Sequence, residues 1–82
     1  MDKHIQIIRE FVVSNFLFGR DSGFANDASF LEQGIVDSTG VMELVAFLEK
    51  QFQIRIADEE LSPENLDSVN AAAGFVAKKL GT

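Results

Sequence analysis

The sequence predicts an all-α fold: a small helical bundle with three main helices, one short helix and a long loop between the first two main helices. Three segments support this prediction, because their apolar residues recur every three or four positions, as on one face of a helix. Only residues 53–56 alternate between polar and apolar, and no second alternating segment exists to pair with them as a strand. With 82 residues and an apolar fraction of 46%, residues 1–82 are expected to form a single domain.

The first predicted helix covers residues 3–17 and is followed by a long loop over residues 19–37. The apolar side chains of the helix lie three, four and four positions apart and so share one face: Ile5, Ile8, Val12 and Phe16. The loop is rich in glycine, aspartate, serine and asparagine. A loop this long is uncommon in a small domain unless it is anchored or functional. Its expected anchors in the core are Phe24, Phe30, Leu31 and Ile35.

The second predicted helix covers about residues 38–51 and has the clearest apolar stripe in the chain. That stripe consists of Val41, Leu44, Val45, Leu48 and Phe52. Met42, Ala46 and Glu49 fall on another face, so we expect them to reach solvent or a partner. Gly40 in the first turn costs up to about 1 kcal/mol relative to alanine. This cost suggests that a small residue keeps space open beside Ser38.

The rest of the chain is predicted to form an extended connector, two short helical turns and a closing helix. The turns lie at residues 58–61 and 62–66, and Pro63 is the first helical residue of the second turn. Ser68 caps the closing helix and Gly81 ends it. The inner face of that helix is expected to comprise Val69, Ala72, Ala73, Val76 and Leu80.

The composition argues against several classes of function. Seven lysine and arginine residues against thirteen aspartate and glutamate residues give a net charge of −6, which repels nucleic acids and anionic membranes and favours a monomer. No apolar run approaches the roughly 20 residues of a membrane span, and the amphipathic start of the chain does not resemble a signal peptide. The chain has no cysteine, so it can form neither disulfides nor thiolate metal sites. We therefore expect a cytoplasmic protein that binds neither nucleic acid nor membrane.

The residues present do not assemble a catalytic or metal site. His4 is the only histidine, and without cysteine the chain can build neither a catalytic triad nor a zinc site. Residues 21–32 have the length of a calcium-binding EF-hand loop. However, Gly23 and Ala25 lack side-chain oxygens at two ligand positions, and Asn26 stands where the loop needs glycine. We expect no catalytic residues, no bound metal and no enzymatic activity.

The most informative segment is residues 34–40, which read Gly-Ile-Val-Asp-Ser-Thr-Gly and join the long loop to the second helix. Ser38 therefore lies at a helix N-terminus, where unpaired backbone N–H groups and the helix dipole favour a negatively charged group such as a phosphate. The plain interpretation is helix capping, because Asp37 and Ser38 are both good N-cap residues. The long preceding loop and the strong apolar stripe that follows favour a functional serine.

This segment and its surroundings resemble the acyl carrier protein family, which includes the peptidyl and aminoacyl carrier domains. The resemblance rests on residues 34–38, on Val-Met-Glu-Leu-Val at residues 41–45, and on Leu48, Glu49 and Phe52. It extends along the chain as a first helix, a long loop, a serine-led helix, a connector with a short helix, and a closing helix. It implies that Ser38 carries 4′-phosphopantetheine, attached from coenzyme A by a separate phosphopantetheinyl transferase that uses Mg²⁺. The thiol of this arm would hold an acyl or aminoacyl group as a thioester.

The resemblance also implies partners and a docking surface. An acyl- or aminoacyl-loading ligase and downstream synthase or transferase enzymes, in fatty acid, lipid or secondary-metabolite biosynthesis, would act on the arm. Asp37 would help to orient the phosphopantetheinyl transferase or a metal-bound phosphate. The implied docking residues are Thr39, Met42, Glu43, Ala46 and Glu49.

Thr39 departs from the leucine that the family most often has after the serine. This departure weakens an apolar anchor and suggests a dedicated set of partner enzymes. The alternative function is an acidic helical interaction module without a prosthetic group, which the composition fits equally well. An accessible serine behind Asp37 at a helix start distinguishes the two, because the module does not need one.

Overall fold

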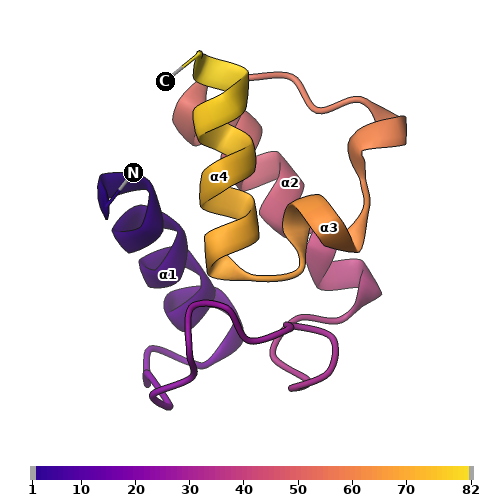
Figure 1. Cartoon of the computed structure of the whole chain (residues 1–82). Helices are drawn as coiled ribbons and strands as arrows, with labels where there is room; N and C mark the ends of the chain where they lie inside the picture. Colours follow the sequence, from indigo (N-terminus) through magenta and orange to yellow (C-terminus); the bar gives the residue numbers. More distant parts are fainter. Residues whose placement is uncertain (1, 82) are drawn as a thin grey trace.

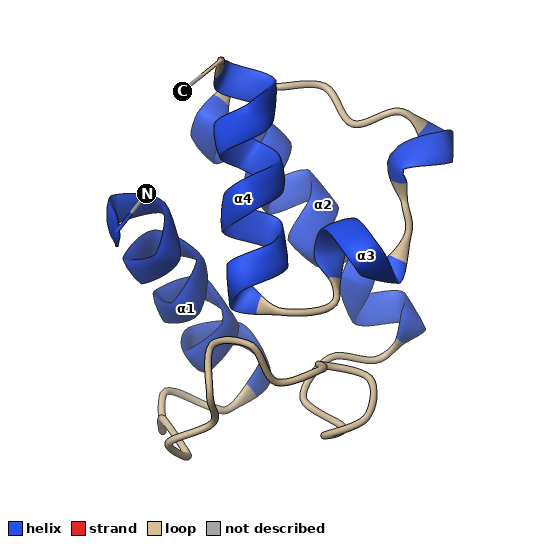
Figure 2. Ribbon diagram, in the orientation of Figure 1, coloured by secondary structure: helices blue, strands red, loops and turns tan. Residues whose placement is uncertain are grey.

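Helices are the only regular structure in residues 2–81, which are the residues that the computed structural model describes (Figure 2). Gln53 turns the chain with a φ of +54°, and residues 54–57 then form an extended connector without a strand partner among the described residues, as expected. The predicted all-α bundle of three main helices and one short helix is thus confirmed. In chain order the elements are α1 (Asp2–Phe16), α2 (Ser38–Phe52), the single 3-10 turn η1 (Asp58–Glu60), α3 (Pro63–Leu66) and α4 (Val69–Leu80).

The arrangement of the helices places the start of α2 at one end of the molecule. Both α1 and α3 pack against α4, and α1 also packs against α2 (Figure 1). The loop between α1 and α2 crosses the lower end of the bundle in this view, whereas α4 finishes at the upper end. Ser38, the first residue of α2, therefore lies at the loop end, away from the last residues of α4.

The core is built from all three main helices and from the loop. Its fully buried side chains include Ile8, Val12, Phe30, Val36, Leu44, Leu48, Val69, Ala72, Ala73 and Val76. Two predictions about the core were wrong. Leu80, expected on the inner face of α4, is 40% exposed, because it lies in the last turn beyond the packed region. Leu31, expected as a loop anchor, is 47% exposed, whereas its neighbour Phe30 is completely buried.

The helix ends follow the predicted capping pattern. The hydroxyl of Ser68 accepts a hydrogen bond from the N–H of Ala71 at 2.9 Å, and Gly81 ends α4 with a φ of +75°, a conformation that glycine adopts readily. Pro63 is the first residue of α3. Both ends of α1 and the C-terminal end of α2 differ from the predicted bounds by one residue, as is usual for helix termini.

Arg9 holds the first half of the long loop against α1. Its guanidinium binds both carboxylate oxygens of Asp21 at 2.8 and 2.9 Å, reaches the Oδ1 atom of Asn26 at 2.6 Å and lies 4.0 Å from the ring centroid of Phe24. The hydrogen bonds from Arg9 lower the pKa of Asp21 below its ordinary value. The carbonyl of Asn26 then accepts a hydrogen bond from the N–H of Asn70 in α4 at 2.9 Å. The loop is therefore tied to two helices.

Asp67 holds the second half of the loop against the junction of α3 and α4. Its backbone carbonyl accepts the N–H of Phe30 at 2.8 Å, and its Oδ1 atom accepts the N–H of Leu31 at 3.0 Å. Its Oδ2 atom accepts the hydroxyl of Ser29. These bonds explain why Leu31 stays beside α3 instead of entering the core, and they position the turn that precedes α2.

Candidate functional site

The start of α2 is capped by Asp37 and not by Ser38. Asp37 has extended backbone angles, and its Oδ1 atom accepts the N–H of Gly40 at 2.7 Å. Its carbonyl accepts the N–H of Val41 at 2.9 Å, the first hydrogen bond of the helix. Ser38 is therefore the first residue inside the helix, and its side chain does not cap the helix.

The hydroxyl of Ser38 is exposed and available. It makes no hydrogen bond to any of the residues that the structure describes. The first N–H groups of an α-helix lack partners within the helix, and Asp37 satisfies only that of Gly40. The backbone N–H groups of Ser38 and Thr39 thus remain, within the described part of the chain, as donors at the positive end of the helix dipole. A group attached to this oxygen would meet both the donors and the solvent.

Gly40 is buried because α1 presses against the first turn of α2. A Cβ atom at Gly40 would lie 2.8 Å from Cε1 of Phe16 and 3.0 Å from Cγ1 of Val36. The ring of Phe16 in turn meets Phe11 edge-on, with 5.8 Å between centroids. The space beside Gly40 is therefore filled by α1 and by the preceding loop. The expectation that this glycine keeps space open next to Ser38 was wrong.

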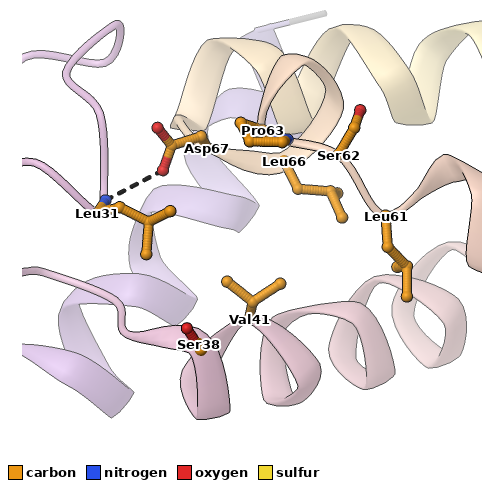
Figure 3. A pocket seen from close by; sticks show the side chains of 8 residues that line it. All are labelled: Leu31, Ser38, Val41, Leu61, Ser62, Pro63, Leu66 and Asp67. Atoms are coloured by element: carbon orange, nitrogen blue, oxygen red, sulfur yellow. Dashed lines mark hydrogen bonds between the residues drawn. The ribbon is translucent and has the colours of Figure 1, made fainter.

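A cleft of about 190 Å³ opens directly beside Ser38 (Figure 3). Figure 3 shows Ser38 and Val41 on α2 facing a wall from the α3 region, with Leu31 closing one side. The dashed bond in Figure 3 is the one from the Leu31 N–H to Asp67, so the loop side of the cleft is held in place. The remaining lining residues are Leu61, Ser62, Pro63 and Leu66. The cleft is apolar with a few polar groups at its edge.

The face of α2 that follows Ser38 is largely open to solvent. Thr39, Glu43 and Ala46 are exposed, and Met42 is 55% exposed. Glu49 differs from them: it is half-buried, and its Oε2 atom accepts the N–H of Ile56 at 2.9 Å. Its carboxylate therefore braces the connector after α2, which leaves it less available to a partner than the sequence suggested.

Comparison with known proteins identifies the kind of site. The family model for the phosphopantetheine attachment site matches residues 17–76, which include the whole of α2 and the cleft. The chain belongs to the acyl carrier protein family. 4′-Phosphopantetheine, bound covalently, is the prosthetic group of this family. An exposed serine hydroxyl that is free of hydrogen bonds, at a helix start and beside an apolar cleft, fits such a group.

The sequence is also similar to those of individual acyl carrier proteins. The chain is 41% identical over 54 residues, or 66% of its length, to the acyl carrier protein of Buchnera aphidicola subsp. Acyrthosiphon pisum, and it spans 65% of that relative's length. It is 31% identical over 68 residues to the acyl carrier protein of Buchnera aphidicola subsp. Schizaphis graminum, covering 83% of this chain and 84% of the relative. A probable acyl carrier protein, PigG, of a Serratia species is 28% identical over 67 residues, covering 82% and 77%.

For two residues of the site, the sequence did not predict the position that the structure shows. Asp67 carried no sequence signal beyond its place before the cap residue Ser68, yet it holds the loop wall of the cleft. Leu31 was expected in the core and instead lines the cleft.

None of the described helices is long and apolar enough to cross a membrane.

Proposed function

We propose that this chain is a carrier protein whose Ser38 is the attachment residue for 4′-phosphopantetheine. The single observation that carries the proposal is the state of the Ser38 hydroxyl, which is exposed, unbonded and placed at the first helical position of α2 by the cap at Asp37. A serine that served as the cap would have its oxygen occupied by a backbone N–H. Here the neighbouring aspartate takes that role, so the serine is free to react.

In the attachment step the Ser38 oxygen forms a bond to phosphorus, and a phosphoanhydride bond of coenzyme A breaks. The adenosine bisphosphate portion leaves, and the hydroxyl proton passes to a base of the phosphopantetheinyl transferase, which uses Mg²⁺. The chain contributes position and electrostatics: the N–H groups at the start of α2 and the helix dipole favour the new phosphodiester. Asp37 keeps this end of the helix ordered and supports the docking of the transferase or of a metal-bound phosphate.

When bound, the group supplies a flexible arm whose thiol holds an acyl or aminoacyl cargo as a thioester. The cleft beside Ser38 offers apolar contacts from Leu31, Val41 and Leu66, and its volume of about 190 Å³ suits only a short chain. The chain itself supplies no catalytic group in this scheme. Its role is to present the cargo and not to transform it.

The proposed partners are a phosphopantetheinyl transferase, an acyl- or aminoacyl-loading ligase, and downstream synthase or transferase enzymes of lipid or secondary-metabolite biosynthesis. Thr39, Met42, Glu43 and Ala46 form the proposed docking face, with an apolar centre at Met42 and a carboxylate at its edge. Glu49 contributes to this face indirectly, through its bond to the connector.

A thiol titration tests this function with very low background, because the chain contains no cysteine. The purified apo protein is incubated with coenzyme A, Mg²⁺ and a broad-specificity phosphopantetheinyl transferase, then desalted and titrated. We expect one thiol per chain for the wild type and for the control Ser14→Ala, which removes an exposed serine on α1, and none for Ser38→Ala. A folded wild-type sample that gains no thiol with a panel of transferases would instead support an interaction module without an arm.

A further inference from the structure

Phe18, just after the end of α1, combines two unfavourable properties. Its side chain is 94% exposed, the largest exposure among the big apolar residues described. Its backbone lies in the left-handed region with a φ of +55°, where glycine or asparagine is favoured over an aromatic residue. The turn itself is an ordinary helix end, in which the N–H of Gly19 bonds the carbonyl of Val13 at 2.9 Å. Nothing in the turn requires phenylalanine at this position.

Phe18 lies at the same end of the molecule as Ser38. The ring of Phe16 reaches within 2.8 Å of the Cβ position of Gly40, in the first turn of α2. The Cα atoms of Phe16 and Phe18 are at most about 7 Å apart. The backbone of Phe18 therefore lies at the same end of the molecule as that turn. Two further exposed apolar side chains belong to this end: Leu31, which lines the cleft with Ser38, and Met42, one turn along α2.

The remaining exposed large apolar residue, Leu80, lies at the opposite end of the molecule, in the last turn of α4 (Figure 1). Three of the four exposed large apolar side chains described, those of Phe18, Leu31 and Met42, therefore belong to the end of the molecule that holds Ser38. Single exposed apolar residues are normal on protein surfaces, but a group of them around one site marks an interaction surface.

The charges nearest Ser38, Leu31 and Met42 are acidic, whereas the exposed Arg20 lies two positions after Phe18. The exposed carboxylates of Glu32, Asp37 and Glu43 lie on the segments that surround Ser38. A surface with apolar side chains and an acidic rim complements a partner that has an apolar pocket inside a basic rim. Phenylalanine, like tyrosine and tryptophan, is enriched in the cores of such interfaces.

We propose that Phe18 is a docking contact for the enzyme that modifies Ser38, and that it enters an apolar pocket of that enzyme next to the basic surface that faces Glu32, Asp37 and Glu43. This inference rests on the proposed carrier function and extends the docking surface from α2 to the end of α1. It explains why a strained and exposed position holds an aromatic side chain. Phe18 acts on recognition and not on the chemistry at Ser38.

The test compares Phe18→Asn with the wild type and with Leu80→Asn as a matched control. Asparagine tolerates the left-handed backbone, so Phe18→Asn should unfold at the same temperature as the wild type or higher. Leu80→Asn removes a comparable exposed apolar side chain at the far end. Steady-state transfer from coenzyme A by a broad-specificity phosphopantetheinyl transferase gives KM and kcat for each chain.

We expect Phe18→Asn to raise KM about tenfold or more with kcat retained, because an interface anchor contributes to binding and not to the reacting centre. Leu80→Asn should leave both constants unchanged. Unchanged KM in Phe18→Asn, or an equal rise in both variants, would overturn the assignment of Phe18 while the carrier function stands. A wild-type chain that is never modified would remove both proposals together.

Discussion

Replacing Gly40 with alanine tests how tightly α1 is packed on the first turn of α2. Helix propensity alone would make the alanine variant more stable by up to about 1 kcal/mol. The added Cβ atom, however, would lie 2.8 Å from Cε1 of Phe16 and 3.0 Å from Cγ1 of Val36. The Val36 side chain is buried and branched, so this side chain has little room to move. Overpacking of this kind costs about 1–3 kcal/mol. We therefore expect Gly40→Ala to lower the free energy of unfolding by about 1 kcal/mol.

Urea unfolding followed by circular dichroism measures this change, which corresponds to a fall of roughly 5 °C in Tm for a domain of this size. Phe16→Leu provides the control, because leucine does not reach as far as the ring atom Cε1. In that background Gly40→Ala should cost less than in the wild type, since the close approach to the Phe16 ring is gone and only the contact with Val36 still opposes the gain in helix propensity. Higher stability of Gly40→Ala in the wild-type background, or an equal loss in both backgrounds, would refute the packing argument.

Two further predictions concern the cap of α2 and the pH dependence of stability. Asp37→Ala should lower the free energy of unfolding by about 1 kcal/mol, because the N–H of Gly40 loses its partner. Asp37→Asn should retain most of the stability, because asparagine also caps helices well. Urea titrations that give the two variants equal stability would contradict this role. The hydrogen bond from Lys79 lowers the pKa of Glu60 below its ordinary value of 4.5. The folded state therefore releases this proton more readily than the unfolded state. The resulting stabilisation is present above pH 4.5 and is lost as the pH falls through the folded pKa. Lys79→Gln should therefore reduce stability at neutral pH and approach the wild type in acid, and a difference independent of pH would contradict that link.

The helices could be predicted because their apolar patterns are local. The stripe from Val41 to Phe52 recurs at helical spacing, and α2 matched its expected bounds to within one residue. Ser68 and Gly81 were predicted as caps for similar reasons, since capping depends on residues within one turn of the helix end. The exposed positions of Met42 and Ala46 followed from the same periodicity.

The parts that could not be predicted depend on contacts between distant residues. Glu49 was expected on an open face, but the chain turns back after Gln53, whose φ is +54°, and brings the N–H of Ile56 onto its carboxylate. Leu31 was expected in the core, yet a bond to Asp67, 36 positions later, holds it at the cleft. Periodicity carries no information about such long-range hydrogen bonds.

The choice between Asp37 and Ser38 as the cap is the decisive example at the site. Both residue types cap helices well, so the sequence left the assignment open. The structure gives the cap to Asp37, because its Oδ1 atom lies 2.7 Å from the N–H of Gly40. The serine is left free by that geometry, and the proposed attachment chemistry depends on it.

Fragmentation mass spectrometry of the transferase-treated wild-type chain tests the central claim most directly. The chain offers other serines as internal controls, among them Ser29 and Ser68, whose hydroxyls are engaged in hydrogen bonds. We predict a single added phosphopantetheine, found only on fragments that contain Ser38. An added group on another residue, or a folded chain that accepts none from any transferase tested, would contradict the assignment of Ser38 as the attachment residue.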